Sequence, residues 1–191
     1  MSHRNAVPDE SISNDRMEMT MTKKEKPATS YCVADALSEA MGEIESLRDE
    51  MQDWYDNMPE GLQGGDKGSE VEECAQTLGA FENVTLHEAL ETADEDGKTE
   101  TGAKSPNVGH LRFDIVRSTK KRQSRNDRRN EATLLLRAAC DAVRTEMEAT
   151  DNDDERLDPY AETRADIDDC LNELDQVADE VDGADFPGMY G

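Results

Sequence analysis

The sequence predicts an all-α fold of antiparallel helical hairpins with coiled-coil-like packing, together with a disordered N-terminus and a linker. Two observations lead to this prediction. Apolar residues recur at alternating spacings of three and four along several segments, which is the period of an amphipathic helix. The chain has 191 residues, of which 35% are hydrophobic and 35% charged, so its helices can bury only a modest core.

Composition and periodicity divide the chain into five segments. Residues 1–30 are polar and aperiodic, as is typical of a disordered terminus. Residues 31–93 form the predicted helical hairpin, and residues 94–110 lack an apolar face and are predicted to be a flexible linker. Residues 111–150 comprise a basic segment plus a helix, and residues 151–191 comprise an acidic helix and the tail FPGMYG.

The first helix of the hairpin is predicted over residues 33–58. Its apolar seam has an unbroken spacing of 4, 3, 4, 3, 4, 3 and 4 residues. The seam consists of Val33, Leu37, Ala40, Ile44, Leu47, Met51, Trp54 and Met58. Such a narrow stripe must be covered by another helix, either in this chain or in a second copy of it.

Proline and glycine predict the hairpin turn. Pro59 ends the first helix because it disfavours helical geometry in the residue before it, and the glycines up to Gly68 make a flexible connection. Ser69 and the acid three residues later have the spacing of a capping box, so the second helix is predicted to begin at Ser69. A second such box at residues 85–88 predicts a break after Asn83.

Residues 111–115 alternate between apolar and polar side chains, with Leu111, Phe113 and Ile115 on one side. This pattern predicts a short strand, for which the sequence shows no partner strand, or a docked extended segment or early helix.

Two further helices are predicted in the C-terminal half. The first covers residues 127–149, and its apolar face comprises Leu135, Ala139, Val143 and Met147, widened by Leu134, Leu136 and Cys140. The second begins at Asp158-Pro159 and ends at Gly183. Its seam comprises Tyr160, Ile167, Leu171, Leu174, Ala178 and Val181, with Arg164 as the one misfit.

The formal net charge of −25 disfavours binding of the whole protein to nucleic acid or to an anionic membrane. No apolar run approaches the roughly 18 residues of a membrane span, and the N-terminus lacks a signal-peptide core. The cysteines are Cys32, Cys74, Cys140 and Cys170, and none forms a CxxC pair. They favour a reduced, intracellular protein of cytoplasmic location.

Residues 112–129 interrupt the acidic character with eight basic and two acidic residues. Three interpretations are open: contact with phosphates, a targeting signal resembling a nuclear localisation tract, or pairing within the molecule with the acidic final helix. Residues 151–185 contain fifteen acids and two arginines, which favours pairing. The candidate phosphate-binding residues are Lys120, Lys121, Arg122, Arg125, Arg128 and Arg129.

No residue pattern points to catalysis, so we expect a protein that is not an enzyme and has no cofactor. The string at His87 is HExxE and lacks the second histidine of a zinc protease. Residues 151–162 match positions 1, 3, 5 and 12 of an EF-hand loop, but Arg156 replaces the required glycine. These acids are Asp151, Asp153, Glu155 and Glu162. We expect an ordinary acidic loop and no metal site.

The aromatic residues and methionines at two places are the candidate contacts for a protein partner. They are Trp54, Tyr55 and Met58 at the hairpin tip, and Phe186, Met189 and Tyr190 in the C-terminal tail. The candidacy of the tip depends on whether the returning helix leaves these side chains exposed.

The stretch ESLRDEMQDWYDNMPEGLQ with its GDKG turn, and the closing helix that runs into DFPGM, resemble small acidic helical proteins encoded by phages. The resemblance covers about 60 residues of the chain. It implies a non-enzymatic accessory or virion-associated protein, and it carries over no catalytic residue.

Together these features predict a non-catalytic interaction or structural accessory protein that acts through amphipathic helices, as a monomer or as a homo-oligomer. One alternative is an acidic mimic of nucleic acid that inhibits a host DNA- or RNA-acting enzyme, using acids at 162, 166, 169, 173 and 180. Another is a weak nucleic-acid binder that uses residues 112–129.

Overall fold

Helices dominate the chain, which confirms the all-α prediction. The computed structural model describes residues 28–91, 107–118, 122–151 and 158–188. Their elements are β1 (Thr29–Cys32), α1 (Val33–Asp56), α2 (Glu60–Gln63), α3 (Asp66–Leu78), the 3-10 helix η1 (Gly79–Asn83), α4 (Glu88–Glu91), β2 (Arg112–Ile115), α5 (Arg125–Thr150) and α6 (Arg164–Asp182).

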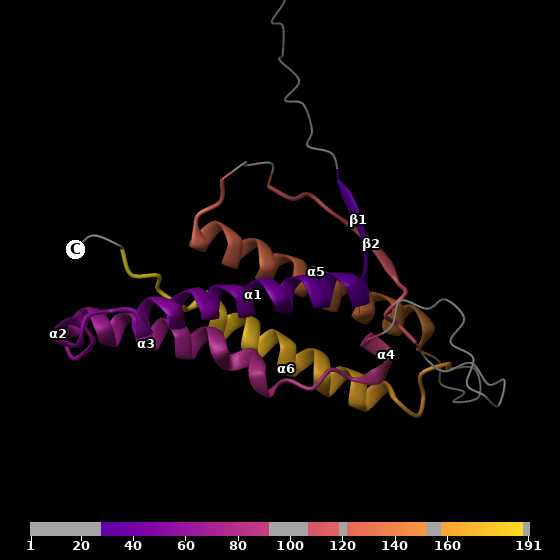
Figure 1. The fold of residues 1–191 in the computed structure, drawn as a ribbon. Helices are drawn as coiled ribbons and strands as arrows, with labels where there is room; N and C mark the ends of the chain where they lie inside the picture. The colour runs from indigo at the N-terminus through magenta and orange to yellow at the C-terminus, as the bar shows by residue number, and fades with distance from the viewer. Residues whose placement is uncertain (1–27, 92–106, 119–121, 152–157, 189–191) are drawn as a thin grey trace, which may run out of the picture.

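The predicted seam of α1 is the centre of the fold. Its positions from Val33 to Met51 are at most 1% exposed, because α3 packs along α1 on one side and α5 on the other (Figure 1). Asn57 follows the helix as its C-cap, and Pro59 prevents its continuation. A single apolar cluster joins α1, α3, α5 and α6, so the hairpin and the C-terminal helices share one core.

The antiparallel hairpin of α1 and α3 is present, but α3 begins earlier than the capping box at Ser69 predicts. Its N-cap is Gly65, and the Ser69 amide already donates to the Gly65 carbonyl. Gly68 lies inside this first turn, where an added Cβ would be 2.1 Å from the Gln63 carbonyl oxygen. The close approach of α2 to α3 therefore sets the start of the helix, and the local capping signal does not.

The predicted break after Asn83 is present, since η1 ends there and an extended stretch leads to α4. The local cap differs from the predicted box at residues 85–88. His87 accepts the Ala89 amide through Nδ1 at 3.2 Å, and α4 forms only one turn.

The alternating segment near residue 113 is a strand, and its partner lies in the segment predicted to be disordered. β1 pairs antiparallel with β2, with Thr29 opposite Ile115 and Cys32 opposite Arg112. The pairing continues into the first turn of α1, where the Val33 amide donates to the Leu111 carbonyl at 2.9 Å. The prediction of disorder through residue 30 is therefore wrong at its C-terminal end, because β2 is a distant partner strand and the residues just before it accept the first amides of α1.

Helix α5 begins at a capping box formed by Ser124 and Asp127. Its predicted apolar face is buried against α1 and α6 with one exception. Leu134 is 50% exposed, whereas Leu135 is 1% exposed. The prediction that Leu134 widens the face is wrong, because this side chain points away from both neighbouring helices.

Helix α6 begins at Arg164, so the predicted start at Asp158-Pro159 is wrong. Every residue of the predicted seam is nevertheless buried. Asp158 accepts the Tyr160 amide at 2.8 Å and forms a turn there. Arg164, the misfit of the seam, donates to the Met147 carbonyl at the end of α5 and to Asp158, each at 2.8 Å. The misfit residue thus connects the end of α5 to the start of α6.

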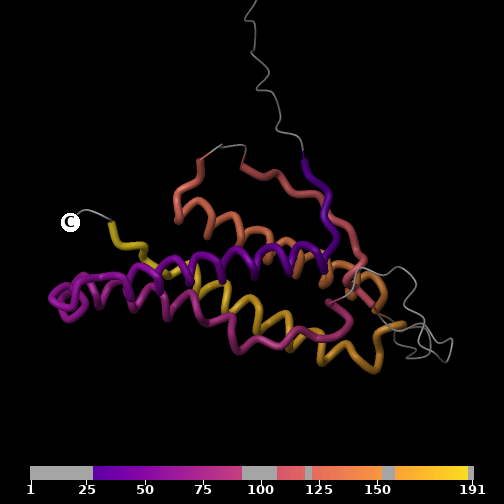
Figure 2. Tube along the Cα trace, viewed as in Figure 1, coloured from indigo at the N-terminus to yellow at the C-terminus, as the bar shows by residue number. Residues whose placement is uncertain are grey.

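Helix α1 crosses in front of α5, and the two-stranded ribbon projects from one end of the helices (Figure 2). Among the described residues, no helix has the length and apolar character needed to cross a membrane.

The neighbouring leucines of α5 provide a test of this packing. Leu135→Ala is expected to lower the free energy of unfolding by about 2–5 kcal/mol, since it removes a fully buried side chain. Leu134→Ala is the matched control and is expected to cost less than about 1 kcal/mol. Urea unfolding followed by circular dichroism measures both, and equal losses would contradict the orientation of α5.

Candidate functional site

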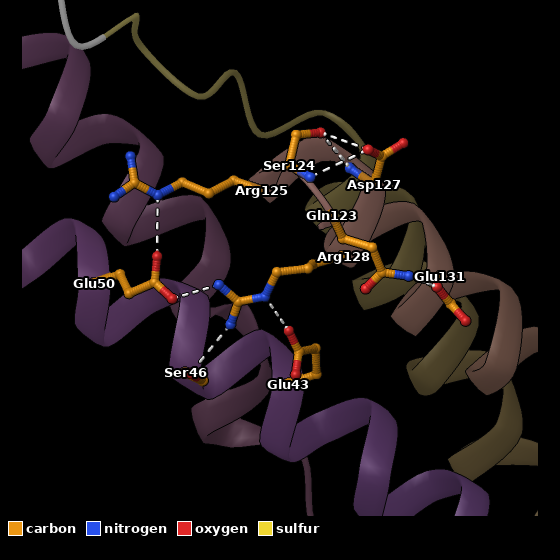
Figure 3. Close-up of polar contacts among 9 residues, drawn as sticks. All are labelled: Glu43, Ser46, Glu50, Gln123, Ser124, Arg125, Asp127, Arg128 and Glu131. Atoms are coloured by element: carbon orange, nitrogen blue, oxygen red, sulfur yellow. Dashed lines mark hydrogen bonds and ion pairs between the residues drawn. The ribbon is translucent and has the colours of Figure 1, made fainter. Parts of the chain in front are cut away.

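Arg125 and Arg128 of the basic segment pair within the molecule, but their carboxylate partners lie on α1 and not on the acidic final helix. Arg125 donates from Nε to Glu50 at 3.0 Å. Arg128 donates to the carboxylates of Glu43 and Glu50, and its Nη2 lies 3.3 Å from the Ser46 hydroxyl (Figure 3). The expectation that the final helix neutralises the basic segment is therefore corrected. The acids of α1 lie nearer because α5 starts alongside α1.

Glu50 receives hydrogen bonds from two arginines. Partial burial alone would raise the pKa of its carboxyl group, but the bonds from Arg128 and Arg125 outweigh burial and hold the pKa below its ordinary value. The carboxylate is therefore ionised over a wider pH range in the folded protein than in the unfolded chain.

Arg117 connects the ribbon to the helices. It donates to Glu131 of α5 at 2.6 Å and also to Glu39 of α1 and to the Tyr31 hydroxyl. Its guanidinium lies 5.6 Å from the centroid of the Tyr31 ring, which stacks on Phe113. The ribbon is thus fixed on the helices by charge-assisted hydrogen bonds and by ring contacts.

The later arginines of α5 do reach the final helix. Arg137 donates to Asp182 at 2.6 Å and to Asp179 at 2.7 Å. Arg144 lies 2.6 Å from a carboxylate oxygen of Asp175. Each arginine of α5 therefore has an intramolecular partner, since Arg129 donates to the Ala184 carbonyl.

The predicted phosphate-binding residues do not form one exposed patch in the described chain. Arg125, Arg128 and Arg129 are engaged as above. Arg122 is exposed, and Lys120 and Lys121 lie outside the described residues. The pairing leaves fewer cations for a phosphate backbone than the sequence alone indicates.

The aromatic residues of the hairpin tip are half-buried against the core. Two cations lie near the ring of Trp54, with Lys67 Nζ at 5.9 Å and the Arg125 guanidinium at 5.7 Å from the ring centroid. The Tyr55 carbonyl accepts a hydrogen bond from Gln63 at 2.9 Å. Met58 is buried. The returning chain therefore covers much of the predicted partner-binding tip.

In the C-terminal tail, Phe186 is partly buried, and its ring centroid lies 5.9 Å from the Arg129 guanidinium. Met189 and Tyr190 lie outside the described residues. The described part of the predicted partner-binding tail therefore contacts α5 through Arg129.

A row of carboxylates on α6 faces solvent. Asp166, Asp169, Glu173 and Glu180 are exposed and form no hydrogen bond or ion pair within the described chain. Their spacing places them together on one flank of α6, beside its buried seam and away from the acids that the α5 arginines contact. Glu162, the fifth acid of the predicted row, is also exposed but precedes the helix.

The four cysteines are free and buried. Burial raises the pKa of Cys74 to about 11 and that of Cys140 to about 12, so both are neutral thiols at pH 7. They pack as small apolar side chains. The described residues contain no group of three or more histidine, cysteine or acidic side chains placed to hold a metal ion. Most of the EF-hand-like stretch, residues 152–157, lies outside them.

Comparison with protein-family models, with curated proteins and with solved structures finds no match to the chain.

Sequence reasoning missed the carboxylates that receive the basic segment. Glu39, Glu43 and Glu50 lie four and seven residues apart, on one side of α1. This spacing matches a row of cations on a neighbouring helix. The signal was therefore present in the sequence, but its use depends on knowing that α5 lies beside α1.

The Glu50 contacts predict a pH-dependent contribution to stability. At pH 7, Glu50→Gln is expected to lower the free energy of unfolding by about 1 kcal/mol, since it weakens two arginine contacts at a partly exposed site. Because the folded-state pKa lies below the unfolded value, this contribution is complete above the ordinary value of 4.5 and disappears as the pH falls through the folded-state pKa.

Urea unfolding of both proteins at pH 7 and towards pH 3 measures this contribution. Glu60→Gln is the control, because Glu60 is exposed and forms no ion pair in the described chain. A difference between wild type and Glu50→Gln that is unchanged at low pH would count against the role of the two arginines.

Proposed function

We propose that the chain is a non-catalytic binding protein that engages a basic protein partner through the acidic outer side of α6. This proposal rests on a difference in pairing between the arginines of α5 and the acids of α6. Every arginine of α5 is engaged inside the molecule, whereas Asp166, Asp169, Glu173 and Glu180 have no partner within the described chain. The described surface therefore presents an excess of carboxylates that a cationic partner can neutralise.

The row on α6 suits an extended contact. Asp166 and Glu180 are fourteen residues apart, which is about 21 Å along a helix at roughly 1.5 Å per residue. The helix is fixed from the opposite side by Arg137, Arg144 and Arg164. A basic partner would therefore meet a rigid set of charges and lose little conformational freedom of this chain on binding.

The apolar seams support contact through charge, because they are buried inside the chain and leave a polar surface. A second copy of the chain is disfavoured on this face, since like charges repel. An accessory role of the phage type, as the sequence resemblance implies, is compatible with this mode of binding. The free buried thiols favour a reducing, cytoplasmic location.

Mimicry of nucleic acid is a second candidate, favoured by a second row of acids. Asp66, Glu70 and Glu73 are exposed on α3 with spacings of four and three residues. Helix α3 also packs against α6. A protein that binds the backbone of duplex DNA could accept two rows of carboxylates on adjoining helices in place of the phosphates.

Binding to a labelled hexa-arginine peptide tests the first proposal. Neutralising the α6 row is expected to weaken binding about tenfold, or about 1.4 kcal/mol, and the wild-type affinity should fall with salt. Fluorescence anisotropy at several salt concentrations measures both effects. The variant combines Asp166→Asn, Asp169→Asn, Glu173→Gln and Glu180→Gln.

A control variant with the same change in net charge separates the α6 row from the overall charge. It neutralises four exposed acids of α1, α2, α4 and α5 that form no ion pair in the described chain. These changes are Asp53→Asn, Glu60→Gln, Glu91→Gln and Glu148→Gln. Equal loss of binding in the two variants, or no binding by the wild type, would overturn the proposal.

Competition with duplex DNA tests mimicry. If the chain is a mimic, it inhibits a sequence-nonspecific nuclease at low salt, and raising the salt abolishes the inhibition. Neutralising Asp66, Glu70 and Glu73 should then raise the inhibitory concentration as much as neutralising the α6 row does. Inhibition that depends on α6 alone would favour the simpler binding protein, and absence of inhibition would exclude mimicry of DNA for that nuclease.

A further inference from the structure

A cleft of about 300 Å³ lies between α3 and the segment that follows α6. Its walls include Glu70, Glu73 and Cys74 of α3 and Asp185, Phe186 and Pro187 of the C-terminal segment. The volume is at the small end of the range for ligand pockets, which suits one side chain better than a large ligand.

The cleft has an apolar wall. Cys74 is 2% exposed, and its thiol lines the cleft without a hydrogen bond to the described chain. Burial raises the pKa of this thiol to about 11, so it adds no charge. Phe186 and Pro187 provide flat apolar surface on the other side. These walls suit a ligand with an apolar stem or a planar group.

The rim of the cleft is negative. The carboxylates of Glu73 and Asp185 form no hydrogen bond or ion pair within the described chain. Glu70 accepts a hydrogen bond from Lys67, with 3.2 Å between Lys67 Nζ and Glu70 Oε2. Arg129 contacts this segment, since it donates to the Ala184 carbonyl and its guanidinium lies 5.9 Å from the centroid of the Phe186 ring. It thereby holds the C-terminal wall, and neither Glu73 nor Asp185 has a hydrogen-bonded cation within the described chain.

We propose that this cleft receives an arginine side chain of the basic protein partner. The inference rests on the proposed function and adds to it a site on α3 and the C-terminal segment, beyond the α6 row. The guanidinium would lie against Phe186, donate to Glu73 and Asp185, and leave its aliphatic stem on Cys74 and Pro187. The negative rim, the small volume and the apolar walls of the cleft all favour an arginine side chain as the ligand.

Arginine fits these walls better than lysine does. Its planar guanidinium has several N–H donors and can bind two carboxylates while stacking on a ring. An ammonium group is a compact, strongly hydrated charge and makes less use of a flat apolar wall.

Titration with N-acetyl-arginine amide, followed in ¹⁵N–¹H correlation spectra of the full chain, tests the site. We expect saturable shifts at the amides of Glu73, Cys74 and Asp185, and weaker binding of N-acetyl-lysine amide. The double variant Glu73→Gln/Asp185→Asn is expected to weaken binding at least fivefold. Shifts without saturation, or spread equally along α6, would overturn the proposal.

A matched variant controls for net charge and folding. Glu148→Gln/Asp168→Asn makes the same change in charge at exposed positions of α5 and α6 and should leave the arginine amide affinity within twofold. Circular dichroism and thermal unfolding verify that both variants are folded. If the control weakens binding as much as the cleft variant does, the cleft has no specific role.

The hexa-arginine experiment separates this proposal from the one on which it rests. If the peptide binds wild type through α6 but the cleft double variant binds it equally well, the cleft fails and the proposed function stands. If wild type does not bind the peptide, the proposed function fails. Saturable binding of the arginine amide would then identify only a cleft for a single side chain.

Discussion

Burial of the α1 seam between α3 and α5 is the contact on which the rest of the structure depends. Its apolar side chains are almost fully inaccessible, and the acids beside them lie next to the arginines at the start of α5. Apolar burial supplies the driving force for this contact, at about 25 cal/mol per Å². The half-exposed ion pairs are individually small. Their arrangement instead selects which side of α1 receives α5, because an acidic segment there would be repelled.

That selection has a consequence for the surface. The chain has 46 acids and 21 lysines and arginines, so cations placed at the α1–α5 and α5–α6 contacts cannot neutralise the outer sides of α3 and α6. Self-repulsion opposes compaction in such a chain. The described fold reduces this repulsion at its interior contacts and leaves the excess carboxylates facing solvent, where water and salt screen them. The acidic surface is therefore the part of the molecule best suited to a cationic partner.

The sequence predicts the seams well and the ends of the helices less well. Periodicity depends on burial along a whole helix, so the positions from Val33 to Met51 are buried as expected. The start of α3 and the start of α6 depend instead on tertiary contacts at Gly68 and Arg164, which compete with local capping signals. The strand partner of Phe113 lies more than eighty residues away, and local patterns contain no information on such a pairing.

The candidate site was predictable only in part for the same reason. The row of acids on α6 follows from spacing alone, and four of its members lie on that helix as expected. The partners of Arg125 and Arg128 do not follow from spacing, because the α1–α5 contact has to be known first. The cleft beside Cys74 was not predictable, since it combines α3 with a segment more than a hundred residues later.

The surroundings of Trp54 are one reason why the proposed function relies on charge and not on the aromatic tip. The Trp54 ring contacts both Lys67 of α3 and Arg125 of α5, so this part of α1 joins three helices. Because this ring is half-buried and Met58 is buried, an apolar contact through Trp54 would compete with these two cations. Recognition by charge involves no such competition, and it accelerates encounter with a basic partner. A cleft shaped for one arginine would supply the selectivity that a row of carboxylates lacks, because it also requires a flat group and an apolar stem.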